Sequence, residues 1–126
     1  MSMRTPLKRA RYLGSAKEGA DHFWRQRMTA VSNIFLGLFL VWLLVSLVGA
    51  DHATVKLKLG QPLIALPLLA LLISVAVHMR LGMQTIIEDY VHSEGLKILA
   101  LMLNTFVAVF VALAGIFAIL KLSFGA

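Results

Sequence analysis

The sequence contains no cysteine, and charged residues make up only 14% of its 126 positions. Without cysteine the chain can form no disulfide and no thiolate metal site, and it cannot ligate an ordinary iron–sulfur cluster. A soluble domain carries about 25% charged residues, whereas this chain is 60% hydrophobic. The composition therefore lacks the polar surface of a water-soluble globule and indicates a membrane protein.

Motifs for nucleotide cofactors are missing as well. The sequence has no phosphate-binding loop and no glycine-rich dinucleotide fingerprint. It also contains no internal repeat and no low-complexity segment. A chain of this kind has no familiar means of holding a flavin or a nicotinamide, so any oxidation of a soluble substrate must take place on a partner chain.

Three apolar segments, at about 28–48, 62–87 and 96–120, are each long enough to cross a bilayer as a helix. Because lipid offers no partner to backbone N–H and C=O groups, each segment must be helical. The connection at 92–95 is very short and predicts antiparallel neighbours, while residues 49–61 indicate a short polar loop. We therefore predict an all-α membrane protein with three transmembrane helices that form part of a multi-subunit helical bundle.

The basic residues are distributed unevenly along the chain. Seven precede the first apolar segment, namely Arg4, Lys8, Arg9, Arg11, Lys17, Arg25 and Arg27. With the N-terminus inside, Arg80 and Lys97 join them on the inner side, and the outer side holds Lys56, Lys58 and Lys121. Since cytoplasmic segments are enriched in Lys and Arg, nine against three predicts an N-terminus in the cytoplasm or in a mitochondrial matrix.

This distribution also suggests a division of the chain. Residues 1–27 are expected to form a basic cytoplasmic segment, and residues 28–126 a three-helix membrane anchor domain. A basic tail occurs in nucleic-acid-binding proteins too, but next to a membrane span it indicates a cytoplasmic flank. We therefore expect no nucleic-acid partner.

His78 is the one histidine of four that lies deep within an apolar segment. A polar ring in lipid must find a partner, so an ionisable residue in a span points to a function. Neutral imidazole is a common axial ligand of haem iron, and a proton relay is the alternative. A haem held by two histidines would need its second ligand from another polypeptide, because no other histidine lies in a span.

Three more polar residues follow His78 on the same predicted helix. Arg80 is rotated from it by about 200°, so it either snorkels to the cytoplasmic interface or pairs with a haem propionate or a partner's acid. Asp89 returns to the His78 face about three turns later, some 17 Å along the helix. Tyr90 is either an interface anchor or a hydrogen-bond donor to a quinone carbonyl.

The stretch "HMRLGMQTIIEDYV" resembles the signature of the small membrane-anchor subunit of succinate dehydrogenase, called the D subunit or hydrophobic membrane anchor. His78, Gly82, Asp89 and Tyr90 match its His–Gly–Asp–Tyr pattern at the same spacing. The order of three spans, the expected orientation and the "DHFWRQRMTA" lead-in, with Arg27 just before the first span, agree as well. The resemblance covers nearly the whole chain.

The resemblance implies a subunit of succinate:ubiquinone oxidoreductase, respiratory complex II, which links the tricarboxylic acid cycle to electron transport in the bacterial cytoplasmic (inner) membrane. FAD and iron–sulfur clusters would belong to a flavoprotein and an iron–sulfur subunit, and this chain would contain no dehydrogenase active site. Haem b would lie between this chain and a second, cytochrome b556-type anchor subunit, with His78 as one axial ligand to the iron.

The resemblance also assigns roles to other residues. Tyr90 would hydrogen-bond ubiquinone, Asp89 would shape that site, and Arg27 would contact the haem or quinone region. Arg80 has no counterpart that the resemblance explains, and its place near His78 makes it a further candidate for contact with the cofactor. Two alternatives stay open: the anchor of a quinol:fumarate reductase, and a small non-redox membrane protein with His78 and Arg80 in a proton relay.

Overall fold

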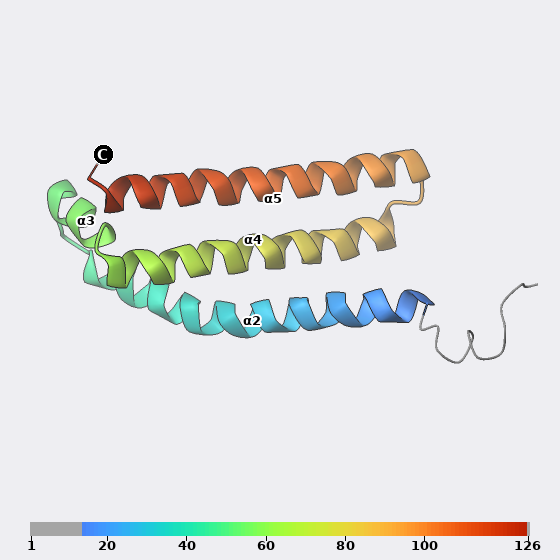
Figure 1. Cartoon of the computed structure of the whole chain (residues 1–126), viewed down its shortest axis with the longest axis horizontal. Helices are drawn as coiled ribbons and strands as arrows, with labels where there is room; N and C mark the ends of the chain where they lie inside the picture. The colour runs from blue at the N-terminus through green and yellow to red at the C-terminus, as the bar shows by residue number, and fades with distance from the viewer. Residues whose placement is uncertain (1–13, 126) are drawn as a thin grey trace, which may run out of the picture.

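The computed structural model describes residues 14–125, and these form three long helices and one short helix (Figure 1). The elements are α2 (Gly14–Ser46), α3 (His52–Leu59), α4 (Pro62–Tyr90) and α5 (Glu94–Ser123). Helices long and apolar enough to cross a membrane run over Gly19–Ser46, Pro62–Tyr90 and Glu94–Ser123. The predicted all-α fold with three spans is confirmed.

The first long helix begins earlier than the hydropathy suggested. α2 starts at Gly14 and runs without a break through the expected boundary at residue 27. No proline interrupts it, and the arginines and glutamine before Met28 are good helix formers. Four of the basic residues counted for orientation, Arg4, Lys8, Arg9 and Arg11, lie outside the described residues.

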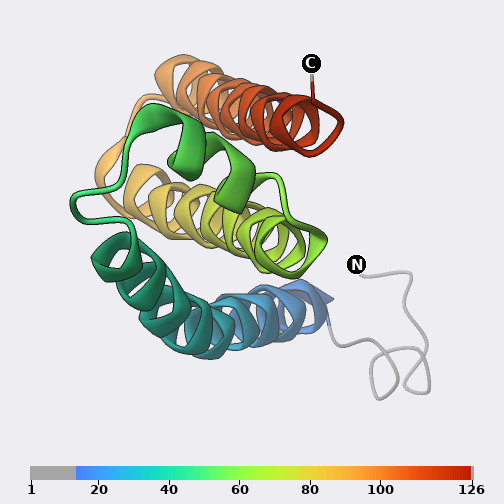
Figure 2. The ribbon, with the colours of Figure 1, turned by 90° about the vertical axis from the view of Figure 1, so that its left-hand side faces the viewer.

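The middle helix, α4, lies between α2 and α5 and contacts both of them (Figure 1). Within residues 14–125, no Cα atom of α2 lies within 8 Å of one in α5. The chain direction alternates, so the start of α2 lies at the same end as the α4–α5 turn, and α3 lies at the opposite end. α4 and α5 are antiparallel neighbours, as predicted. Figure 2 shows the three long helices as a curved row rather than a closed bundle.

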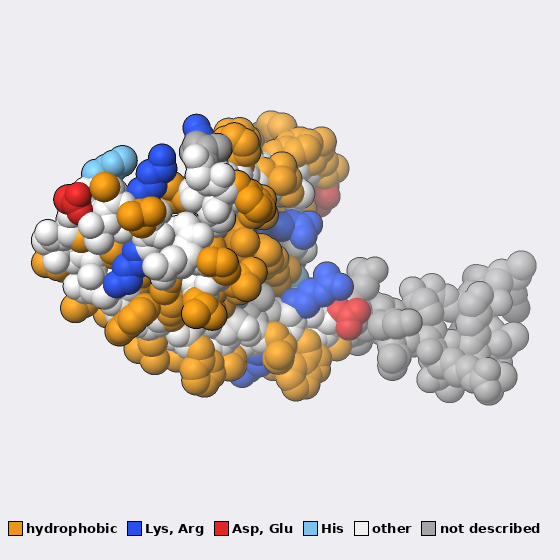
Figure 3. All heavy atoms as spheres, turned by 60° about the vertical axis from the view of Figure 1, so that its left-hand side comes forward, with side chains coloured by type: hydrophobic (Ala, Val, Ile, Leu, Met, Phe, Trp, Pro, Cys, Tyr) orange, Lys and Arg blue, Asp and Glu red, His pale blue; other side chains and the backbone are white. Residues whose placement is uncertain are grey.

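An open row of helices buries few side chains. The buried hydrophobic residues of the described chain are Leu43, Ile64, Ala65, Ala76, Leu81, Ile87 and Ala108. On the outer helices, large apolar side chains such as Phe35 and Phe110 are 70% and 73% exposed. Figure 3 shows hydrophobic atoms over much of the visible surface between two groups of charged side chains. Water could not cover these faces without a large cost, so lipid or other membrane helices must cover them.

The connection between the first two spans is a helix and not the expected polar loop. α3 begins after Asp51, whose carboxylate oxygen accepts a hydrogen bond of 3.2 Å from the Thr54 backbone N–H. Hydrogen bonds from the Thr54 side chain and then from its backbone amide lower the pKa of Asp51 below its ordinary value of 3.8. Asp is a favoured N-cap because it satisfies an otherwise unpaired N–H of the first turn. The cap and the packing described next explain why this short segment is helical.

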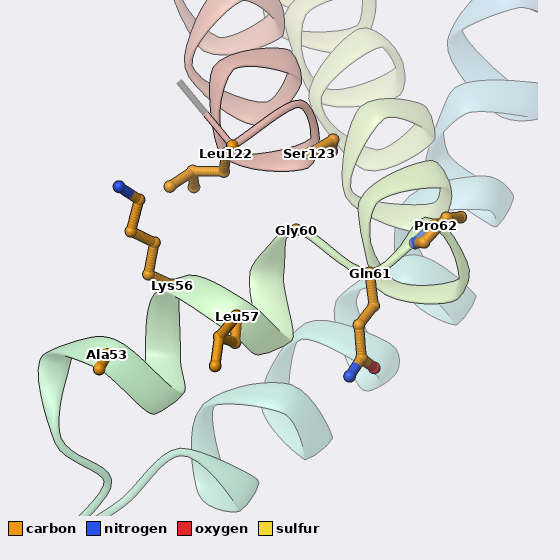
Figure 4. Close-up of a pocket in the computed structure, with 9 residues that line it drawn as sticks. Ala53, Lys56, Leu57, Gly60, Gln61, Pro62, Leu122 and Ser123 are labelled. Atoms are coloured by element: carbon orange, nitrogen blue, oxygen red, sulfur yellow. The ribbon is translucent and has the colours of Figure 1, made fainter.

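Gly60 ends α3 and lies directly against the end of α5 (Figure 4). A Cβ atom at Gly60 would come within 2.7 Å of the Leu122 carbonyl oxygen, which is backbone and cannot rotate away. We expect Gly60→Ala to push α3 away from α5 and to destabilise the fold by about 1–3 kcal/mol, as overpacking commonly does. Thermal unfolding in detergent is the measurement.

Gly95→Ala is the matched control, because nothing lies within 4 Å of a Cβ built there. If both variants unfold at the wild-type temperature, α3 does not dock on α5 as described.

Candidate functional site

His78 lies in α4 and joins that helix to α2. Its ring nitrogen Nδ1 is 3.0 Å from Oγ1 of Thr29. The other ring nitrogen, Nε2, forms no hydrogen bond with any of residues 14–125. One ring nitrogen is thus bonded to α2, and the other has no hydrogen-bond partner among these residues.

Thr29 is the residue that sequence reasoning missed. Its hydroxyl lies 2.8 Å from the Arg25 carbonyl oxygen and 3.0 Å from that of Gln26, within its own helix. Its backbone oxygen accepts a hydrogen bond of 3.3 Å from Ser74, one turn before His78. A threonine near the start of a span carries no signal by itself, and only the contact of α2 with α4 reveals its role.

Near this contact, α2 and α4 line an open groove of about 690 Å³, and His78 itself is not among its lining residues. Its lining from α2 is Gly19, His22, Phe23, Gln26, Arg27 and Ala30, and from α4 it is Gly82, Thr85 and Ile86. Gly82 lies one turn after His78 on the same face of the helix. A Cβ atom at Gly82 would meet only Gln26 Nε2, at 3.5 Å, so the chain's own packing does not require glycine there.

Two polar atoms in the wall of this groove are buried without a hydrogen-bond partner, Nε2 of His22 and Oε1 of Gln26. Buried polar atoms are nearly always paired in native proteins, so unpaired ones call for an explanation such as a missing ligand. Arg27 is exposed at the groove, with its guanidinium carbon 4.2 Å from the centre of the Phe23 ring. The groove therefore combines an apolar wall with polar groups that suit a partly charged ligand.

Arg80 lies on another side of α4 and is not brought together with His78. Its Nε donates a hydrogen bond of 3.2 Å to Thr105 on α5, and its backbone oxygen accepts one of 2.9 Å from Asn104. It also lines a second, smaller pocket of about 310 Å³ with residues that include Asp21 and Arg25. This direction agrees with the rotation computed from the helix period. A contact between Arg80 and the cofactor stays a prediction.

Asp89 and Tyr90 end α4 on the side of the molecule where α2 begins (Figure 1). Both are exposed, and Tyr90 is 76% exposed. Asp89 lies about 17 Å from His78 along the helix axis, at 1.5 Å per residue. The two residues lie at the end of the row where α2 begins, whereas Arg27 lies nearer the level of His78, since Gln26 and Thr29 beside it contact Gly82 and His78.

Of the other histidines, His22 lies near the start of the Gly19–Ser46 span and lines the groove, and the remaining two lie outside the spans. His52 begins α3, and His92 is exposed in the turn between α4 and α5. Within residues 14–125, no three His, Asp or Glu side chains gather to hold a metal ion. The largest pocket at the far end, about 670 Å³ between α3 and the end of α5, includes Lys56 and Leu122 and lies away from His78 (Figure 4).

Comparison with known proteins agrees with this arrangement. The family model of the succinate dehydrogenase/fumarate reductase transmembrane subunit matches residues 1–112. No solved structure gives a significant match.

Three relatives carry the name of membrane anchor subunit of succinate dehydrogenase. The hydrophobic anchor of Rickettsia bellii is 33% identical over 75% of both chains. That of Paracoccus denitrificans is 28% identical over 97% of this chain and 94% of its own. The membrane anchor of Reclinomonas americana is 31% identical over 74% of this chain and 80% of its own. The extent of the family match and these identities decide the assignment: the chain belongs to the transmembrane subunits of succinate dehydrogenase and fumarate reductase, as a multi-pass membrane anchor of the succinate dehydrogenase kind.

Proposed function

We propose that this chain holds haem b together with a second, cytochrome b556-type anchor subunit and helps form the ubiquinone-reduction site of succinate:ubiquinone oxidoreductase. The observation that carries the proposal is His78, held at Nδ1 by Thr29 inside a membrane-spanning helix and beside an open groove. Neutral imidazole is a common axial ligand of haem. The second axial ligand comes from the other anchor, because no second histidine of residues 14–125 lies within the interior of a span.

The groove fits a haem in three respects. Gly82 leaves space one turn from His78, where a larger side chain would take up room against the α4 surface. The exposed guanidinium of Arg27 suits the carboxylate of a haem propionate, since charge-assisted hydrogen bonds of this type are strong. The His22 nitrogen is buried and unpaired in this chain, and it would suit a second propionate after a rotation of the ring toward the groove. Bound there, haem supplies a centre that accepts and returns single electrons.

The dehydrogenase chemistry belongs to other chains. A flavoprotein subunit holds FAD and oxidises succinate, and an iron–sulfur subunit carries the clusters that lead to the membrane. Lack of cysteine and of nucleotide-binding motifs in this chain supports that division. This chain then contributes the membrane anchor, one haem ligand and part of the quinone site.

Ubiquinone binds near the end of α4. The Tyr90 phenol donates a hydrogen bond to a quinone carbonyl, and the Asp89 carboxylate beside it orients the phenol or accepts a proton. Both side chains are exposed in the isolated chain, as residues of a site completed by partner subunits would be. The half of the row on this side carries Arg25, Arg27 and Lys97, which supports an inward-facing position, in our proposal the cytoplasmic side of a bacterial inner membrane.

An optical spectrum of the assembled four-subunit complex tests this proposal. The complex purified in mild detergent and reduced with succinate or dithionite should show a reduced-minus-oxidised spectrum of b-type haem. A complex that contains all four subunits, reduces ubiquinone and has no haem would refute haem binding by this chain.

Gly82 offers a test that separates the needs of the cofactor from those of the fold. We expect Gly82→Leu to leave the three helices intact, because only Gln26 Nε2 lies near a Cβ there. The larger side chain should oppose haem binding by about 1–3 kcal/mol, the usual cost of overpacking. Haem per assembled complex, measured as the pyridine adduct, is the readout.

Gly95→Leu is the control on α5, because a Cβ atom there meets nothing within 4 Å and Gly95 does not line the groove. Undiminished haem in an assembled Gly82→Leu complex would show that the groove is not where haem lies.

A further inference from the structure

We infer that Thr29 is a positioning residue for the haem ligand: its hydroxyl accepts the Nδ1 proton of His78 and so presents the Nε2 lone pair to iron. The inference rests on the proposed haem ligation by His78 and adds to it a residue on a different helix. The deciding question is which neighbour accepts the single hydroxyl proton of Thr29.

The Thr29 hydroxyl has one proton and three neighbours that could accept it. These are the Arg25 carbonyl oxygen at 2.8 Å, the Gln26 carbonyl oxygen at 3.0 Å and His78 Nδ1 at 3.0 Å. The two carbonyl oxygens can only accept, whereas a neutral imidazole can carry its proton on either nitrogen. If the hydroxyl donates within its own helix, its lone pairs stay available, and His78 satisfies one of them only by donating Nδ1–H.

The opposite arrangement is incompatible with iron. If the hydroxyl donated to Nδ1, the ring proton would have to lie on Nε2. A protonated Nε2 has no lone pair for a metal, and Nδ1 would face Thr29 at 3.0 Å with no room for one. The network that runs from His78 to Thr29 and on to Arg25 is therefore the only one that leaves a ring nitrogen for ligation.

This network also strengthens the ligand. Metal-bound histidines commonly donate their second N–H to an oxygen, which fixes the ring orientation and raises the basicity of the ligating nitrogen. Here the acceptor is itself polarised by its bond to the Arg25 carbonyl, and successive hydrogen bonds reinforce each other. Ser74 bonds to the Thr29 backbone and holds the same point of contact between α2 and α4.

A more basic ligand favours ferric over ferrous iron, so loss of the Thr29 hydroxyl should raise the haem midpoint potential. Loss of an outer partner costs about 10- to 100-fold in metal affinity. If the affinity for ferric haem falls tenfold and that for ferrous haem does not change, the midpoint potential rises by about 59 mV for a one-electron couple. Thr29→Val removes the hydroxyl and keeps the side-chain shape, and Thr29→Ser restores the hydroxyl.

The protein contains a matched control for this test. Thr105 on α5 also bonds a carbonyl of its own helix, that of Leu101 at 3.0 Å, and accepts a side-chain bond from α4, from Arg80 at 3.2 Å. Thr105→Val therefore removes a helix-to-helix contact of the same kind without touching His78. A merely structural role for Thr29 predicts the same result for both valine variants.

The experiment is a redox titration and an electron paramagnetic resonance spectrum of haem in the assembled complex. We expect Thr29→Val to raise the potential and alter the low-spin ferric signal, Thr29→Ser to keep both near wild type, and Thr105→Val to change neither. An unchanged potential and signal in Thr29→Val, or an equal shift in Thr29→Ser, would overturn the inference.

If the Thr29→Val complex does not assemble, pulsed electron paramagnetic resonance of the wild-type haem takes the place of this variant. After exchange into heavy water and selective labelling of the ligand from this chain, a deuteron on Nδ1 with the quadrupole coupling of a hydrogen-bonded N–D supports the inference, and the coupling of a free N–D refutes it. A wild-type complex without haem would instead refute the proposed function, so the two failures are distinguishable.

Discussion

His78→Ala is expected to leave an assembled succinate dehydrogenase complex that has lost most of its haem b. His78 provides the one imidazole of residues 14–125 that lies within the interior of a span, and no neighbouring His, Asp or Glu cluster could replace it. Loss of the ligand itself should exceed the roughly 10- to 100-fold that loss of an outer partner costs. Haem per complex and the reduced-minus-oxidised spectrum are the measurements.

Two controls make this result specific. His52→Ala changes an exposed histidine on α3, at the opposite end of the row, and should keep the full haem content. Added imidazole should partly restore the spectrum of His78→Ala, because the deleted side chain leaves room for a free ligand. Wild-type haem content in an assembled His78→Ala complex would contradict ligation by His78. Quinone turnover is the weaker readout, since a haem can stabilise a complex without carrying every electron.

The membrane-spanning helices can be predicted from the sequence because lipid offers no hydrogen-bond partner to the backbone. An apolar stretch in a bilayer must be helical, so three such stretches predicted three helices, and Pro62 marked the start of α4 correctly. The helix α3 was missed, because its eight residues alternate polar and apolar, which is the period of a strand and not that of an amphipathic helix. Its stability depends on the Asp51 cap and on the fit of Gly60 against Leu122, and that fit is a tertiary contact.

The candidate site divides in the same way. His78 could be found from the sequence, because an imidazole in a hydrophobic run is costly and therefore informative. The direction of Arg80, away from His78, followed from the helix period, but its partner Thr105 did not. Thr29 could not be found, because threonine is common near span ends and its contact with His78 joins residues 49 positions apart. Helix faces are local properties of a sequence, whereas pairs across helices depend on how the helices pack.

The open shape of the chain leaves the proposed quinone site incomplete in one subunit. α4 has neighbours on two sides only, and the outer faces of α2 and α5 carry exposed large apolar side chains (Figure 2). Met79, Met83 and Ile86 on α4 are likewise 40%, 43% and 52% exposed. These residues lie on the turns between His78 and Asp89, so a partner helix packed there would cover the path between the haem ligand and the end of α4.

Tyr90→Phe is expected to lower ubiquinone reduction while succinate oxidation with artificial dyes and haem content stay at wild-type levels. Phenylalanine keeps the aromatic ring, so if Tyr90 only anchors the chain at the membrane interface, ubiquinone reduction should not change. A fall in ubiquinone reduction would therefore mean that the phenol hydroxyl bonds to the quinone. The size of the effect then identifies the role of the hydroxyl.

A neutral hydrogen bond contributes about 0.5–1.5 kcal/mol, so loss of binding alone raises KM for ubiquinone about two- to tenfold. Proton transfer by a positioned side chain contributes about 10²–10⁴-fold, so a fall in kcat of that order would mean that Tyr90 also delivers a proton. Asp89→Asn should then lower kcat as well, because the amide keeps the shape but cannot relay the proton.

Trp24→Phe is the matched control, since Trp24 in the first part of α2 is another exposed aromatic residue, and it should leave both constants unchanged. Equal turnover in wild type and Tyr90→Phe would make Tyr90 an interface anchor. In that case the contact with quinone would have to come from the partner subunits, and the part of this chain in the reaction would be confined to the haem ligand and the groove beside it.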